Sequence, residues 1–212
     1  MTSLSHEIFS RIFCHPIEVE DVCMAQRPKL YLAGPDVFLP NAAEIGQRKK
    51  DLCESFGFEG LYPLDNEAMQ GFSEERRDAF IYRANVGMIH DADAGIVNLT
   101  PFRGVSADVG TAFELGLLTG LNRPVFAYSN DAETLLERTK RNGMATYDSA
   151  TSSWRDPHGL LIEDFGNADT LMLTEALTAQ GGVLIRIDAQ GRLDEFAGFI
   201  ACLEEAQKYF SG

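Results

Sequence analysis

Two carboxylates near the middle of the chain have the spacing and surroundings of a catalytic pair. Asp108 stands where the N-cap of a helix is expected, and Glu114 follows in an apolar stretch that runs to Leu118. The separation corresponds to about 600° of helical rotation, so the two side chains can share a site only if Asp108 precedes the helix and folds over its first turn. Gly110 lies between them and lets a ligand approach the backbone. The alternative interpretation is an ordinary helix cap followed by a solvated glutamate.

Further polar groups lie at the ends of predicted strands. Tyr31 and the Gly34-Pro35 turn belong to the first strand, and Asp65 and Asn66 follow the second. Ligands of parallel sheets bind beyond the carboxyl ends of the strands, so these groups are expected near the two carboxylates. A core aromatic residue at Tyr31 and an Asx turn at Asp65-Asn66 are the structural alternatives.

Strands and helices alternate along the chain, and this alternation must position the candidate residues. Short apolar runs predict strands at 29–33, 60–64, 94–99, 124–128 and 182–187. Amphipathic segments predict helices at 41–56, 74–90, 108–120 and 193–210. The pattern is typical of an α/β fold with a single, doubly wound, mostly parallel five-stranded sheet flanked by helices.

The length of 212 residues suits one domain with additions. Residues 1–28 are mixed in polarity and are interpreted as an N-terminal extension, whereas 29–212 form the α/β domain. The polar, aperiodic stretch at about 129–168 predicts a long loop or an insertion, which in a compact domain is usually functional.

Composition excludes several classes of protein. The 32 acidic residues outnumber the 18 basic ones and give a net charge of −14, which argues against a nucleic-acid binder and against adhesion to an anionic membrane. No apolar run approaches the roughly 18 residues of a membrane span. The four cysteines form no Cys-x-x-Cys pair, so neither a zinc site nor a disulfide framework is predicted. With no signal pattern at the N-terminus, we expect a cytoplasmic protein with reduced thiols.

From Lys29 to Tyr128 the sequence resembles the nucleoside 2-deoxyribosyltransferase family. The resemblance is carried, in order, by Tyr31-Leu32-Ala33-Gly34-Pro35 with Phe38, Pro63-Leu64-Asp65-Asn66-Glu67, Ile89-His90-Asp91-Ala92-Asp93, Thr100-Pro101-Phe102-Arg103-Gly104 and the segment from Asp108 to Gly116. It implies a deoxyribosyltransferase-like, flavodoxin-like fold and a homo-oligomer. Its implied substrates are 2′-deoxynucleosides and free purine or pyrimidine bases, with no metal and no organic cofactor.

The resemblance also implies roles for individual residues. Glu114 would be the nucleophile that attacks C1′ of the deoxyribose in a retaining transfer, and Asp108 would hold the base and relay a proton. Tyr31 would orient Glu114 by a hydrogen bond. Asn85 would contact the sugar or the base, and Phe38 would stack on the base. The other candidate substrate-binding residues are Gly34, Pro35, Asp65, Asn66 and Gly110.

Two other functions are compatible with this pattern. Related enzymes that hydrolyse the N-glycosidic bond of deoxynucleoside 5′-monophosphates resemble the Glu114 motif but carry Ser, a phosphate binder, at the position of Asp108. Asp108 would repel a phosphate, which favours nucleosides. A non-catalytic nucleoside sensor needs no nucleophile and is the less expected alternative.

One departure concerns the neighbouring subunit. In many members of the family, an Asn-Leu-Met stretch of one subunit enters the site of the next. Here the comparable stretch reads Thr170-Leu171-Met172, with Thr in place of Asn.

Overall fold

The computed structural model describes residues 27–65 and 76–212. Asn66, the start of the helix predicted from 74, and nearly all of the N-terminal extension lie outside the described residues. None of the helices in the described part of the chain has an apolar stretch long enough to cross a bilayer.

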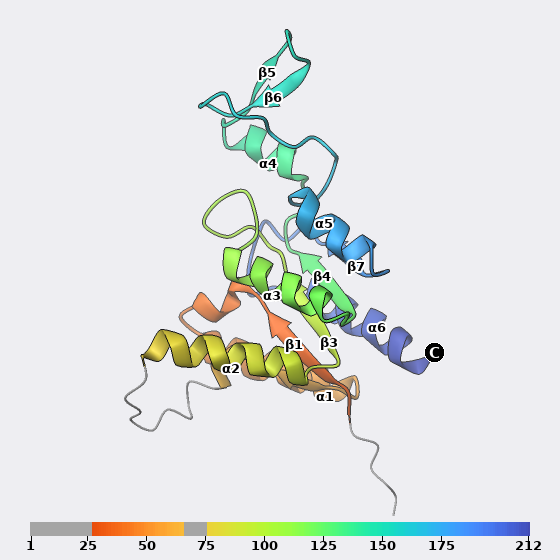
Figure 1. Cartoon of the computed structure of the whole chain (residues 1–212). Helices are drawn as coiled ribbons and strands as arrows, with labels where there is room; N and C mark the ends of the chain where they lie inside the picture. Colours follow the sequence, from red (N-terminus) through yellow and green to blue (C-terminus); the bar gives the residue numbers. More distant parts are fainter. Residues whose placement is uncertain (1–26, 66–75) are drawn as a thin grey trace, which may run out of the picture.

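A five-stranded parallel sheet forms the centre of the molecule (Figure 1). Its strands are β1 (Lys29–Ala33), β2 (Glu59–Leu61), β3 (Ala94–Asn98), β4 (Val125–Ser129) and β7 (Val183–Arg186). They lie in the order β2-β1-β3-β4-β7, and every neighbouring pair is parallel. The predicted fold class is therefore confirmed. The second strand is shorter than expected, because it ends at Leu61 rather than continuing to 64.

Helices cover both faces of the sheet. The helices are α1 (Ala42–Ser55), α2 (Arg77–Asp91), α3 (Val109–Gly120), α5 (Leu171–Thr178) and α6 (Ala197–Ser211). Along β1, Leu30 and Leu32 pack with α1 and α6, whereas Tyr31 and Ala33 pack with α2, α3 and α5. In Figure 1, α2 and α3 lie in front of the sheet and α1 and α6 behind it. This alternation follows from the two-residue period of a strand and places Tyr31 under α3.

The strand order reverses between β1 and β3. From β1 the chain moves outward to β2, and then crosses back to the opposite side of β1 to form β3. The connections that leave β1 and β3 therefore diverge, and a crevice opens beyond their carboxyl ends. The turn after β1, formed by the short helix η1 (Pro35–Phe38), and the start of α3 border this crevice.

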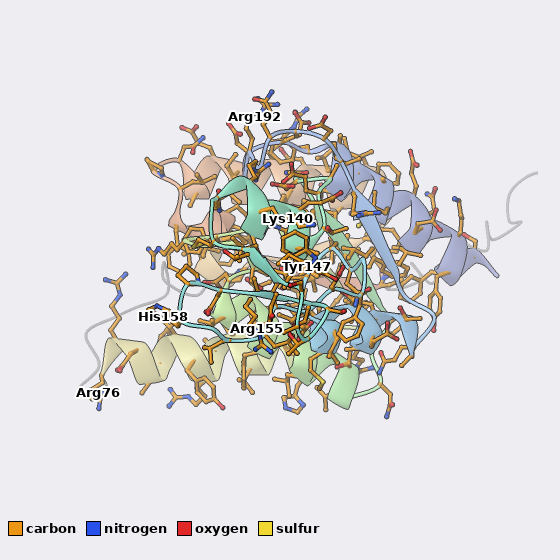
Figure 2. The ribbon with its side chains drawn as sticks, turned by 90° about the horizontal axis from the view of Figure 1, so that it is seen from above. Arg76, Lys140, Tyr147, Arg155, His158 and Arg192 are labelled. Atoms are coloured by element: carbon orange, nitrogen blue, oxygen red, sulfur yellow. The ribbon has the colours of Figure 1, made fainter. Side chains whose placement is uncertain are left out.

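The stretch at 129–168 carries secondary structure that the sequence pattern does not reveal. It contains the helix α4 (Leu135–Arg141) and an antiparallel hairpin of β5 (Thr146–Asp148) and β6 (Ser153–Arg155). The helix α4 is only seven residues long, and the hairpin strands contain no apolar run, so no hydrophobic pattern marks them. Lys140 of α4 lies 3.8 Å from the ring centre of Trp154 and joins the helix to the hairpin. Figure 2 looks down on this region and shows Lys140, Tyr147 and Arg155 near the middle of the view.

Candidate active site

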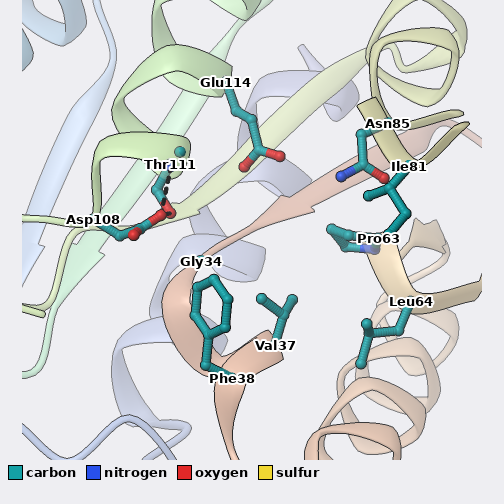
Figure 3. Close-up of a pocket in the computed structure, with 11 residues that line it drawn as sticks. Gly34, Val37, Phe38, Pro63, Leu64, Ile81, Asn85, Asp108, Thr111 and Glu114 are labelled. Carbon is teal, nitrogen blue, oxygen red and sulfur yellow. Dashed lines mark hydrogen bonds between the residues drawn. The ribbon is translucent and has the colours of Figure 1, made fainter. Parts of the chain in front are cut away.

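A cavity of about 340 Å³ lies at the crevice between β1 and β3 (Figure 3). Four elements supply its wall: the turn after β1, the segment after β2, the helix α2 and the first turns of α3. The lining residues are Gly34, Val37, Phe38, Pro63, Leu64, Ile81, Asn85, Asp108, Gly110, Thr111 and Glu114. The volume lies in the range of small-molecule sites, and most of the wall is apolar with a few polar groups.

Glu114 is a partly buried carboxylate of this wall and accepts a hydrogen bond from Tyr31. The Tyr31 hydroxyl donates to Oε1 of Glu114 at 2.5 Å. Burial raises the pKa of Glu114 to about 7, the Tyr31 hydrogen bond opposes this rise, and the negative charges of Asp108 and Asp36 add to it. Burial, together with the charge of Glu114, also raises the pKa of Tyr31 well above its usual range, so Tyr31 stays a neutral donor.

Asp108 is the N-cap of α3. Its Oδ2 accepts from the backbone N–H of Thr111 at 3.0 Å and from the Thr111 hydroxyl at 3.2 Å. The side chain thus folds over the first turn of the helix, which is the condition under which Asp108 and Glu114 can border one cavity. Figure 3 shows both carboxylates on the same side of that cavity. A Cβ at Gly110 would lie 2.9 Å from the capping oxygen, so a side chain there would disturb the cap.

Asn85 and Phe38 border the cavity at other sides. The Oδ1 atom of Asn85, on α2, is buried and has no hydrogen-bond partner among the described residues, so a ligand donor can satisfy it. Phe38 is 55% exposed, and its ring stacks on Phe102 with a centroid distance of 5.2 Å. The guanidinium of Arg103 lies 5.2 Å from the centre of the Phe38 ring. Phe38 therefore presents an accessible aromatic ring to the cavity, and contacts with Phe102 and Arg103 fix the position of this ring.

Two predicted substrate-binding residues lie elsewhere. Pro35 is buried in η1 and is not part of the cavity wall. Asp65 is also outside the wall, because it accepts from Lys50 at 2.6 Å and from the backbone N–H of Tyr62 at 3.3 Å. The Tyr62 bond runs to a residue earlier in the chain and is not the predicted Asx turn, whose N–H donor lies outside the described residues. The neighbours Pro63 and Leu64 line the cavity instead.

A buried polar cluster behind the cavity was not predicted. The carboxylate of Asp36 accepts from Lys49 at 2.7 Å, from the hydroxyl of Tyr62 at 3.1 Å and from the side-chain amide of Asn98 at 3.3 Å. One sequence signal was available: Lys49 occupies the buried stripe of α1 together with Ile45 and Cys53. A lysine on an apolar stripe requires a buried partner.

A second unpredicted cluster holds the segment that precedes Asp108. Asp169 accepts from the hydroxyl of Ser106 and from the backbone N–H of Ala107, the latter at 2.8 Å. Arg138 of α4 is buried, lies 3.7 Å from Asp169 and donates to the carbonyl of Val105 at 2.8 Å. The insertion thus anchors the loop that carries the N-cap. Within residues 27–65 and 76–212, no three His, Cys, Asp or Glu side chains gather as a metal site would require.

Comparisons with known proteins identify the family and the fold of this chain. The sequence model of the nucleoside 2-deoxyribosyltransferase family matches residues 30–172. A 2-desoxiribosyltransferase from Leishmania mexicana is similar in structure, with a TM-score of 0.58 and 28% identity over 84% of this chain and 97% of that chain. An uncharacterized protein of Schizosaccharomyces pombe is 28% identical over 175 residues, 76% of this chain and 82% of its own.

A conserved protein from Enterococcus faecalis V583 shares the fold, with a TM-score of 0.51 and 15% identity over 85% of this chain and 99% of that chain. The family match spans β1 through the start of α5 and includes every residue of the cavity wall. The chain belongs to the nucleoside 2-deoxyribosyltransferase family.

Proposed function

We propose that this protein transfers the 2-deoxyribosyl group between the nucleobases of 2′-deoxynucleosides, with retention, through a glycosyl ester on Glu114. The observation that carries the proposal is the 2.5 Å hydrogen bond from Tyr31 to Glu114 in a cavity wall that also contains Asp108. A carboxylate on one side of the sugar and a proton donor at the leaving base are what a retaining glycosyl transfer requires. Membership of the family supports the substrate class.

In the first half of the reaction, Glu114 attacks C1′ and the bond from C1′ to the base nitrogen breaks. The electron pair of that bond goes to the base, and Asp108 relays a proton from solvent to the base as it leaves. Tyr31 engages Oε1 of Glu114, which fixes the orientation of the carboxylate and leaves its other oxygen available for attack. The products are the free base and the glycosyl ester.

In the second half, the nitrogen of another base attacks C1′ and Glu114 departs as a carboxylate. Asp108 relays the N–H proton of the incoming base to solvent. The Tyr31 hydrogen bond stabilises the departing carboxylate. Each half inverts the configuration at C1′, and the two inversions together give retention.

The cavity favours a neutral nucleoside over a 5′-monophosphate. Val37, Leu64 and Ile81 offer apolar contacts to a base and a deoxyribose. Asp108 occupies the N-terminus of α3, where its carboxylate already accepts the Thr111 N–H that an anionic ligand would use. A phosphate would meet this negative charge without a free helix terminus to compensate for the repulsion.

We assign other wall residues the roles that the family resemblance implies. The exposed ring of Phe38 stacks on the base. The unpartnered Oδ1 of Asn85 accepts a hydrogen bond from the sugar or the base. Gly34 and Gly110 present backbone to the cavity, which the sugar contacts at the turn after β1 and at the first turn of α3.

Base exchange tests this proposal. The protein is mixed with deoxyadenosine and hypoxanthine, and chromatography is expected to show adenine and deoxyinosine. Release of free base and free deoxyribose alone would identify a hydrolase, and binding without turnover would identify a sensor. Glu114→Ala is expected to abolish exchange, whereas Glu204→Ala, at an exposed position on α6, leaves it unchanged.

We also propose a cytoplasmic homo-oligomer. Large apolar side chains that a partner copy could cover are exposed after the hairpin and at the start of α5, namely Leu160, Leu161, Phe165 and Met172. Sedimentation equilibrium is expected to give a dimer or a larger assembly, and a monomer at micromolar concentration would contradict this.

The proposed cytoplasmic location is supported by two buried free thiols, Cys53 and Cys202, which suit a reducing compartment. Cell fractionation tests the location.

A further inference from the structure

A buried ion pair lies behind the cavity wall, and the reaction described above makes no use of it. Lys49 and Asp36 are 2.7 Å apart, with side chains only 3% and 1% exposed. Tyr62 and Asn98 donate to the same carboxylate. Donors from α1, from the end of β2 and from the end of β3 therefore fix Asp36 and the η1 turn that contains it.

The ion pair is oriented with its negative end toward the cavity. Asp36 packs against Gly34, because a Cβ built on Gly34 would lie 2.5 Å from Oδ1 of Asp36. Gly34 belongs to the cavity wall. The ammonium group of Lys49 is surrounded instead by residues outside the cavity wall. It lies 5.2–6.0 Å from the ring centres of Tyr62, Tyr128 and Phe199.

The charge of Asp36 acts on the cavity. Because the pair is buried, solvent screens it weakly. Three titratable groups from different elements act on Glu114: Tyr31 from β1, Asp108 from the start of α3, and Asp36 from η1. The charge of Asp36 raises the pKa of Glu114, although the two side chains form no hydrogen bond with each other.

We propose that Asp36 is a positioning residue whose fixed negative charge, acting through Gly34, stabilises the positive charge that develops on the deoxyribose during transfer. This inference rests on the proposed function. An oxocarbenium-like sugar carries positive charge at C1′ and the ring oxygen, and a preorganised buried anion lowers its free energy more than that of the neutral substrate. Lys49 has the supporting role, because a buried carboxylate without a cation would take up a proton and lose its charge.

The double variant Asp36→Asn/Lys49→Met isolates this charge. It removes both charges and replaces the lysine stem by an apolar chain. The amide oxygen at position 36 accepts from Tyr62 or from Asn98, which bond different oxygens of Asp36 in the wild type. Neutral replacements of buried ion pairs are often tolerated. We expect kcat to fall about tenfold while KM changes by less than about twofold, because the charge acts on the transition state rather than on the bound substrate.

The acid limb of kcat/KM supplies a readout that a structural role would not move. Removing a neighbouring anion lowers the pKa of Glu114, so the limb is expected at lower pH in the double variant. Leu203→Ala, in the core beneath α6, is the control: it lowers the melting temperature and leaves kcat and the acid limb unchanged. Should Asp36→Asn/Lys49→Met not fold, Asp36→Asn/Lys49→Gln, which retains polar contacts, carries the same test.

A titration of ligand-free protein separates this inference from the proposed function. With carbon-13 in the glutamate carboxyl groups, the midpoint of Glu114 is expected at lower pH in the double variant than in the wild type. This readout needs no turnover. Absence of base exchange in the wild type would refute the proposed function. The role of Asp36 would be overturned by an unchanged titration midpoint of Glu114 in the double variant. It would also be overturned by a double variant that has the wild-type kcat and a changed melting temperature.

Discussion

Glu114 is a carboxylate in surroundings that disfavour its charge. Burial and two neighbouring carboxylates raise its pKa to about 7, and the hydrogen bond from Tyr31 favours the ionised form. The site therefore combines a basic nucleophile with a donor that holds it in place. The residue pattern left Glu114 either buried or solvated, and the resemblance to the family implied its hydrogen bond with Tyr31. Asp36 was missed because its donors lie 13, 26 and 62 residues away in the chain.

The Tyr31→Phe variant tests the hydrogen bond to Glu114. The nucleophile must be ionised, so kcat/KM of the wild type is expected to rise with pH through an acid limb near 7. Loss of the hydrogen bond removes the contact that lowers the pKa of Glu114. The acid limb should therefore move to higher pH, with activity at neutral pH reduced about 10- to 100-fold. A pH–rate profile measures this, and a limb at unchanged pH would contradict the role of Tyr31.

Glu114 also makes stability depend on pH. Its pKa is about 7 in the folded protein against 4.5 for the unperturbed group, so the folded state binds the proton more tightly than the unfolded chain. The stabilisation from this group is fully present below about 4.5 and is lost as pH rises through about 7. Glu114→Gln is therefore expected to gain about 1–3 kcal/mol relative to the wild type at about pH 8, and much less at about pH 4. Urea unfolding at the two pH values measures the difference, and equal gains would contradict the buried charge.

At the scale of elements, two short segments set the geometry of the cavity. The η1 turn carries Val37 and Phe38 to the wall and is tied down through Asp36. The loop before α3 is tied to α4 through Asp169 and Arg138. The alternation of strands and helices was predictable because short apolar runs mark the strands of the sheet and amphipathic periods mark the long helices. The short α4, its hairpin and α5 were not, since capping and long-range contacts define them more than periodicity does.

Gly34→Ala tests how closely the η1 turn packs. The backbone at Gly34 is extended and accepts an alanine, but the added Cβ would lie 2.5 Å from Asp36 Oδ1 and 2.7 Å from Asn98 Cβ. We expect a loss of about 1–3 kcal/mol in stability and of at least about tenfold in kcat/KM, because the turn must shift. The matched control is Gly87→Ala on α2, where a Cβ meets nothing within 4 Å and stability is expected to stay equal or rise. Similar losses in both variants would show that the turn has no special role.

At the scale of the whole molecule, the net charge of −14 favours neutral substrates. The rate with a deoxynucleoside is expected to be independent of salt between about 20 mM and about 200 mM, since a neutral ligand feels no long-range field. A deoxynucleoside 5′-monophosphate is expected to react poorly and to improve as salt screens the repulsion. Initial rates at constant pH measure both, and a monophosphate that reacts faster than the nucleoside at low salt would contradict the proposed substrate class.

The central claim is that Glu114 carries the deoxyribosyl group between two bases. Incubation with a deoxynucleoside that bears fluorine at C2′ slows both halves of the reaction, because fluorine destabilises the cationic transition state. Intact-mass spectrometry is expected to show one added fluorodeoxyribosyl group, peptide mapping to place it on Glu114, and added free base to remove it with formation of a new nucleoside. An adduct on another residue, or base exchange by a variant that lacks the Glu114 carboxylate, would contradict the account.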